Sequence, residues 1–158
     1  MNSSMVIYED EFRQIADICE RLRRDTSAKA VFLIDKDGQL ILATGQYAHL
    51  DTTALASLTA GNIAATGGLA DLIGEREFSI LFHEGEHDSL HISLVASQVI
   101  LVVMFGEETS VGLVRLRVRK VNEELTKIVQ ELMQKAKNPG ADSPFAEISD
   151  EDIDILFS

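Results

Sequence analysis

The chain has 158 residues, of which 46% are hydrophobic and 25% are charged, which is typical of one soluble globular domain. The net charge of -12 argues against nucleic acid as a partner, because phosphate binding requires a basic surface. No apolar run approaches the roughly 20 residues that span a bilayer, and the N-terminus does not resemble a secretory signal, so no membrane insertion is expected. The single cysteine excludes a disulfide framework and fits a reducing cytosol.

The first part of the chain predicts a helix followed by a hairpin. Residues 8–26 place Phe12, Ile15, Cys19 and Leu22 on one helical face, so Cys19 is expected to be a packing residue rather than a nucleophile. The apolar runs "AKAVFLID" and "GQLILATG" flank "DKDG", which predicts two strands joined by a turn at the glycine.

A second helix is predicted over residues 51–74, with Asp51 or Thr52 as its N-cap and Gly74 at its end. The runs "FSILFHE", "LHISLVA" and "QVILVVMF" predict three strands, with a tight turn near Ser97. The last helix is predicted over residues 111–137 from an apolar stripe at spacings of three and four. Its members are Val114, Val118, Val121, Leu125, Ile128 and Leu132.

The order of elements is α-β-β-α-β-β-β-α, and the hairpins predict an α+β fold with an antiparallel five-stranded sheet covered by helices on both faces. "NPGADSP" ends the last helix, so we divide the chain into a domain over residues 1–137 and a tail over residues 138–158. The tail has six acids and no Lys or Arg, which leaves a charge of -6 for the domain.

The second helix carries unusually small side chains. At about 100° per residue, its large apolar residues gather on one side, which we expect to pack on the sheet. The other side lacks charge between Asp51 and Asp71, although a solvated helix face normally carries Lys, Glu or Arg. The large residues are Leu55, Leu58, Leu69, Leu72 and Ile73. The small residues opposite them are Ser57, Ala60, Ala64 and Gly68, flanked by Gly61 and Gly67.

Two explanations of this small-residue face are considered. Each glycine within a helix costs roughly 0.5–1 kcal/mol relative to alanine, so some interaction should offset the cost. The face either docks a second helix or a partner protein, or is buried on both sides within one chain. A phosphate-binding loop is disfavoured because the glycines lie mid-helix and no "GxxxxGK[ST]" follows a strand. Asn62 lies near the large apolar side and is expected to bond to backbone.

No catalytic, metal or cofactor site is predicted. His83, His87 and His91 fall across a predicted hairpin, where a spacing of four does not bring three rings together, so a polar turn is favoured over a metal site. No nucleophile–base or paired-carboxylate arrangement stands out, which argues against an enzyme. One dense basic cluster is either a solvated face that pairs with nearby acids or with the tail, or a contact for an acidic or phosphate-bearing partner. Its members are Arg115, Arg117, Arg119 and Lys120.

The tail combines acids with an apolar edge. Ser149 can cap a short helix, and Ile148 and Ile153 stand where a hydrophobic staple would pack. Such a helix is too short to be stable alone, so we expect it to fold onto a partner, with a frayed terminus as the alternative. The candidate partner-binding residues of the tail are Phe145, Ile148, Ile153, Leu156 and Phe157.

The element order, the helix "DTTALASLTAGNIAATGGLADLIG" and the segment "ETSVGLVRLRVRK" resemble the Roadblock/dynein light-chain superfamily, and within it the MglB-type bacterial GTPase-activating proteins. The likeness covers about residues 8–137, and "SPFAEISDEDIDILF" resembles the C-terminal extension of that type. It identifies residues 1–137 as a Roadblock-like domain.

The resemblance implies a non-enzymatic regulator of a small Ras-like GTPase of the MglA type, in bacterial cell polarity and gliding motility. It implies a cytoplasmic homodimer located at a cell pole, with a continuous intersubunit sheet, paired second helices and two protomers per GTPase. GTP hydrolysis would be stimulated without an arginine finger, through contacts at Ala60, Ala64 and Gly68, and the C-terminal segment would modulate nucleotide exchange. The alternative is a scaffold or adaptor dimer that localises a GTPase or motor component.

Overall fold

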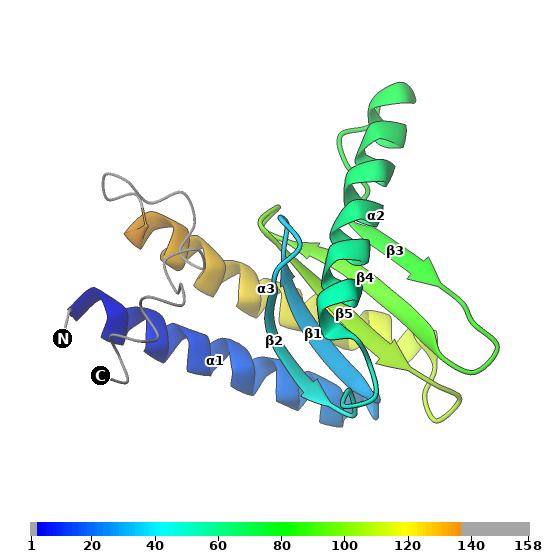
Figure 1. The fold of residues 1–158 in the computed structure, drawn as a ribbon, viewed down its shortest axis with the longest axis horizontal. Helices are drawn as coiled ribbons and strands as arrows, with labels where there is room; N and C mark the ends of the chain where they lie inside the picture. Colours follow the sequence, from blue (N-terminus) through cyan, green and yellow to red (C-terminus); the bar gives the residue numbers. More distant parts are fainter. Residues whose placement is uncertain (1–2, 137–158) are drawn as a thin grey trace.

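The computed structural model describes residues 3–136, with side chains from residue 9 onward. Within these residues, three helices and five strands occur in the predicted order (Figure 1). They are α1 (Ser3–Thr26), β1 (Ala30–Asp35), β2 (Leu40–Gly45), α2 (Thr52–Leu72), β3 (Ile80–His83), β4 (Ser89–Val95), β5 (Val99–Phe105) and α3 (Val111–Lys135). Among these helices none is long and apolar enough to cross a membrane.

The five strands form one antiparallel sheet in the order β2-β1-β5-β4-β3, which confirms the predicted α+β class. The predicted turns are also confirmed. Gly38 closes the first hairpin at φ +97, and Ala96 and Ser97 turn β4 into β5 with φ values of 53 and 55. The two central strands, β1 and β5, are buried along their whole lengths.

Helices cover both faces of the sheet. α1 and α3 lie side by side against one face, and α2 is the described helix that crosses the other (Figure 1). Alternate residues of the strands therefore enter two separate cores. Val31, Leu33 and Leu101 face α1 and α3. Phe32, Ile100 and Val102 face α2.

The apolar stripe of α3 packs largely as predicted. All of its members are buried except Ile128, which is half-buried because the neighbouring Val129 occupies the core position instead. Cys19 is fully buried in the same core, and desolvation raises the pKa of its thiol to about 12. A thiol with such a pKa stays protonated at neutral pH, so the structure confirms that Cys19 is a packing residue.

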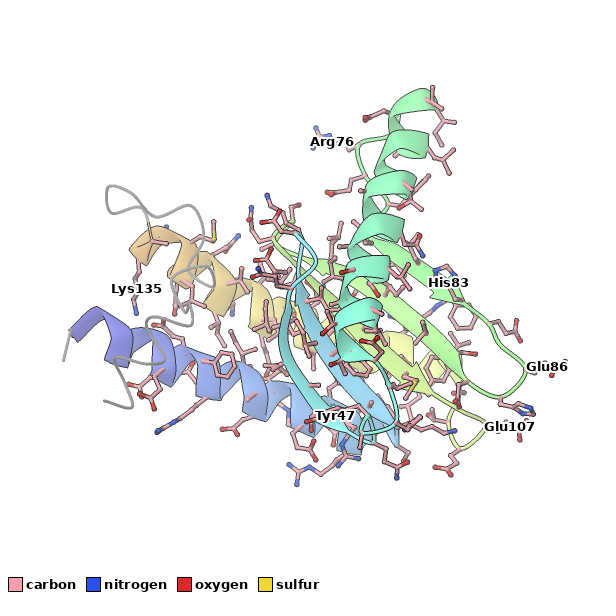
Figure 2. The ribbon with its side chains drawn as sticks, viewed as in Figure 1. Tyr47, Arg76, His83, Glu86, Glu107 and Lys135 are labelled. Atoms are coloured by element: carbon pink, nitrogen blue, oxygen red, sulfur yellow. The ribbon has the colours of Figure 1, made fainter. Side chains whose placement is uncertain are left out.

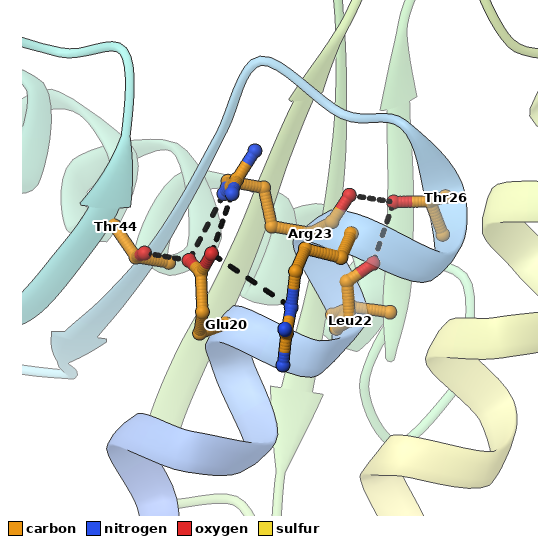
Figure 3. A network of polar contacts seen from close by, with 6 residues as sticks. Glu20, Leu22, Arg23, Thr26 and Thr44 are labelled. Atoms are coloured by element: carbon orange, nitrogen blue, oxygen red, sulfur yellow. Dashed lines mark hydrogen bonds and ion pairs between the residues drawn. The ribbon is translucent and has the colours of Figure 1, made fainter.

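A polar network holds the end of α1 against the edge strand β2 (Figure 3). The carboxylate of Glu20 accepts hydrogen bonds from the guanidinium of Arg23 and from the hydroxyl of Thr44 on β2. Thr26 donates to the carbonyl of Leu22, 2.7 Å away, and closes the last turn of the helix. The Arg23 and Thr44 hydrogen bonds lower the pKa of Glu20 from 4.5 to about 2.

This network predicts a pH-dependent contribution to stability. Because the pKa of Glu20 is depressed in the folded state, its contribution is complete above about pH 5 and is lost as pH falls from about 4.5 toward 2. Glu20→Gln should therefore lower the free energy of unfolding at pH 7 and make little difference near pH 2. Urea unfolding of both proteins across this range measures the effect. A difference that does not change with pH would contradict the assignment of the ion pair.

Candidate partner-binding surface

α2 is bounded by the signals that the sequence predicts. The carboxylate of Asp51 accepts a hydrogen bond from the Ala54 N–H, at 3.0 Å, as an N-cap does. Gly74 follows the helix at φ +77, the left-handed conformation that favours glycine after a C-cap. The C-terminal half of α2 extends past the sheet, so only its first half lies over the strands (Figure 1).

The inner side of α2 is made of small and medium side chains. Ala56, Thr59 and Ala70 are buried, and Leu55, Ala60 and Ile63 are half-buried. Ala56, Leu55, Ala60 and Ile63 belong to the core formed with β1, β4 and β5. Small residues let the helix backbone approach the sheet, whose own large side chains, such as Phe32 and Ile100, fill the space between the two layers.

The prediction that the large apolar residues of α2 pack on the sheet is wrong, except for Leu55. The others are largely exposed: Leu58 is 74%, Leu69 57%, Leu72 83% and Ile73 67% accessible. Leu69, Leu72 and Ile73 belong to the part of the helix that extends beyond the strands. We call these four residues the large stripe. They share one side of the helix as predicted, but that side faces away from the core of the chain.

The predicted small-residue face is also mostly exposed. Ser57, Gly61, Ala64 and Gly68 are exposed and Gly67 is half-buried, whereas Ala60 turns toward the sheet. A Cβ atom added to Gly61, Gly67 or Gly68 would meet nothing within 4 Å. Within the described residues α2 is therefore not buried on both sides, and that alternative is wrong. We call Ser57, Gly61, Ala64 and Gly68 the small stripe.

The two stripes point to opposite flanks of the sheet. Asn62, which follows Leu58 by one turn, has its Nδ2 3.0 Å from Nε2 of His83 on β3. Its partner is thus a side chain, and the prediction of a backbone partner is wrong. On the other flank, a Cβ at Gly38 would lie 3.5 Å from the Cα of Ser57. The large stripe therefore lies toward β3, and the small stripe toward the β1–β2 hairpin.

β3 adds an open strand edge to the flank that carries the large stripe. In the described sheet it pairs only with β4, and its four residues end the strand order. Ile80 on this strand is 54% accessible. Open edges and large exposed apolar side chains are features that soluble proteins normally cover. The residue pattern alone did not predict that the large stripe is exposed, although the absence of charge on both sides of α2 was a signal for it.

The three histidines do not converge. His83 points toward α2, while His91, which pairs with Phe82 across the hairpin, lies on the opposite face of the sheet. His87 lies in the turn between these strands. Burial, together with the nearby charge of Arg115, lowers the pKa of His91. Residues 3–136 contain no group of His, Cys, Asp and Glu side chains suited to a metal ion.

The basic cluster lies on α3, across the sheet from α2. Arg115, Arg119 and Lys120 are exposed and Arg117 is half-buried. The Cζ atom of Arg115 lies 6.0 Å from the ring centroid of Phe82, which stacks on Phe105. The structure therefore does not bring this cluster together with the small stripe. The predicted contacts of the tail, Phe145, Ile148, Ile153, Leu156 and Phe157, lie outside the described residues.

Comparison with known proteins fits this architecture. Residues 14–105 match the model of the Roadblock/LC7 domain. The structure of Myxococcus xanthus MglB is 58% identical, with a TM-score of 0.74, over 76% of this chain and 90% of that one. The chain belongs to the MglB branch of the Roadblock/LC7 family.

Two further MglB structures support this membership. The gliding protein MglB from Thermus thermophilus is 31% identical, with a TM-score of 0.72, over 77% of this chain and 92% of that one. An MglB structure with a tetrameric arrangement is 30% identical, with a TM-score of 0.71, over 77% and 91% of the two chains. A comparison with curated protein sequences found no match to the chain.

The open space around the helical glycines predicts a gain in stability. Gly68→Ala should raise the free energy of unfolding by about 0.5–1 kcal/mol, because alanine favours the helix and its Cβ meets no described atom. Gly45→Ala is the contrasting variant, since its Cβ would lie 2.3 Å from the carbonyl oxygen of Lys29 at φ +96, and it should destabilise the protein. Denaturant unfolding compares the two. Destabilisation by Gly68→Ala would show that another backbone already contacts this glycine.

Proposed function

We propose that this protein is a homodimeric regulator that stimulates GTP hydrolysis by a small Ras-like GTPase of the MglA type, in the cytoplasm of a bacterium that uses it for polarity and gliding motility. The observation that carries the proposal is the 58% identity to Myxococcus xanthus MglB across 90% of that chain. The exposed, uncharged outer side of α2 supplies a surface on which such an assembly can form.

The large stripe and the β3 edge together form the homodimer interface. Pairing two β3 edges would satisfy their open backbone groups and extend the sheet across both copies. It would also place the neighbouring α2 helices together, so that Leu58, Leu69 and Leu72 leave water. The tetrameric arrangement of a related MglB supports assembly between copies of such a chain.

The small stripe forms the GTPase contact. Ser57 and Ala64 have short side chains and Gly68 has none, so the backbone of a switch loop can approach the helix closely. A dimer presents two such stripes, which fits one GTPase held by two protomers. Ala60 turns toward the sheet, so it contributes to this contact indirectly, by packing α2 against the sheet.

The mechanism is differential binding. A surface that binds the hydrolysis-competent switch arrangement more tightly than the alternatives shifts the GTPase toward it. The small stripe itself carries no ionisable side chain, and the basic cluster lies on the other face of the sheet. These positions favour stimulation without an arginine finger.

A second candidate function is a scaffold or adaptor dimer that holds the GTPase without altering catalysis. It is favoured by the same absence of ionisable side chains from the small stripe. Phosphate release by the GTPase, with and without the protein, distinguishes the two. Faster release supports regulation, whereas binding with unchanged release contradicts it and leaves the adaptor.

The domain and the tail have different roles in this proposal. Residues 1–137 form the Roadblock domain that dimerises and binds the GTPase. The tail over residues 138–158 modulates nucleotide exchange through Phe145, Ile148, Ile153, Leu156 and Phe157.

A matched pair of charge insertions tests the assignment of the two stripes. Ala64→Arg should abolish GTPase binding and leave the dimer intact, because it places a long cation on the small stripe only. Leu69→Arg should break the dimer, because a cation would be buried between two apolar helices. Size-exclusion chromatography with light scattering, alone and with the GTPase, reads both properties. If Ala64→Arg breaks the dimer and Leu69→Arg abolishes GTPase binding, the two assignments must be exchanged. If neither variant changes either property, α2 belongs to neither interface.

The position of the basic cluster predicts the outcome of arginine replacements. Arg115→Ala, Arg117→Ala and Arg119→Ala should each leave stimulated phosphate release within about tenfold of the wild type, whereas loss of an inserted finger arginine costs roughly 10³-fold or more. Lys127→Ala, farther along the same exposed side of α3, is the control. A collapse of stimulation in one arginine variant alone would identify that residue as a finger.

A further inference from the structure

We propose that the acidic tail of this chain has a docking site on the domain itself, at the exposed face of α3 around Leu116. The occupant is the segment from Ile148 to Phe157. This inference concerns the intact chain without any partner, and it does not depend on the GTPase.

The proposed site is the exposed apolar residue Leu116 with two cations, Arg119 and Lys120, beside it. Leu116 is 50% accessible on the outer side of α3, away from the core stripe of Val114 and Val118. Arg119 and Lys120 follow it by three and four residues and so lie beside it on the helix surface. They and Arg115 are exposed, and none of the three forms an ion pair with a described residue.

The tail carries the matching chemistry. "ISDEDIDILF" contains four acids interleaved with large apolar residues, so it offers anions to the cations around Leu116 and apolar side chains to Leu116 itself. The large stripe of α2 is a poorer site, because the helix has no Lys or Arg from Thr52 to Leu72 and would leave most of the acids unpaired. The chain as a whole carries -12, which makes this dense basic cluster an exception on an acidic protein.

The length of the connection suits this site. α3 runs back from Lys135 to Leu116 over about 28 Å, at about 1.5 Å per residue. The roughly 12 residues from Ala136 to Ile148 can span up to about 40 Å, which is enough to reach this site. A tether that can reach a site raises the effective concentration of its segment there, into the millimolar range for short linkers. A weak contact is therefore sufficient to populate the docked state.

The helix that carries the site, α3, lies on the opposite side of the sheet from α2 (Figures 1 and 2). A docked tail would thus leave both stripes of α2 free. A partner that binds the tail would have to compete with α3, which would make tail capture dependent on ionic strength.

Paramagnetic relaxation in the intact chain tests the proposal. Ser158→Cys provides a site for a nitroxide label, while Cys19 is buried and has a pKa raised to about 12, so it should stay unmodified. The expected result at low salt is strong broadening of the amide signals of residues 112–120. It should weaken in 0.5 M salt. Broadening confined to α2, or none on α3, would overturn the proposal.

A charge-reversal pair checks that the contact depends on the cluster. Arg119→Glu should reduce the broadening of residues 112–120 at least severalfold. Lys127→Glu makes the same change of charge on the same exposed side of α3 and should leave the broadening unchanged. Equal effects of both variants would mean that only the overall charge attracts the tail, and would contradict a site around Leu116. Thermal unfolding of both variants verifies that they are folded.

Discussion

The structure depends on how the two faces of one five-stranded sheet are covered. α1 and α3 together bury the first face, with the fully buried strands β1 and β5 at its centre. Of the described elements, only α2 covers the second face, and it packs through small and medium side chains and then extends past the strands (Figure 1). One helix cannot place all its apolar residues against a sheet that it only partly overlies. The remaining apolar residues of α2 therefore stay accessible in the single chain.

This incomplete cover explains the composition of α2. A helix with solvent on its outer side would carry charged residues there, yet α2 has none between Asp51 and Asp71. Its outer surface divides into the large stripe near the β3 edge and the small stripe near the first hairpin. In the proposed assembly a second copy of the chain buries the large stripe, which the sheet leaves exposed. The small stripe allows the GTPase to approach the helix closely. The same feature thus links the fold of one chain to its proposed action on another.

The sequence predicted the features that local chemistry determines. The element order, the Asp51 cap, the glycine turn at Gly38 and, apart from Ile128, the stripe of α3 are confirmed, because each depends on neighbours along the chain. The prediction of which side of α2 packs on the sheet is wrong, because a helix that is apolar all round gives no signal of which side meets its own sheet. The bond from Asn62 to His83 joins two separate elements, and no local pattern encodes it.

The most direct test of the account is a methyl NMR titration of the intact protein with the GTP-bound GTPase. The protein would carry labelled Ala and Leu methyl groups. We predict that the Ala64 methyl signal shifts on addition of the GTPase and saturates at two protomers per GTPase. The methyl signals of Leu69 and Leu72 should stay in place, because a second copy already covers them. Shifts confined to Leu69 and Leu72, or no shift on α2 at all, would contradict it.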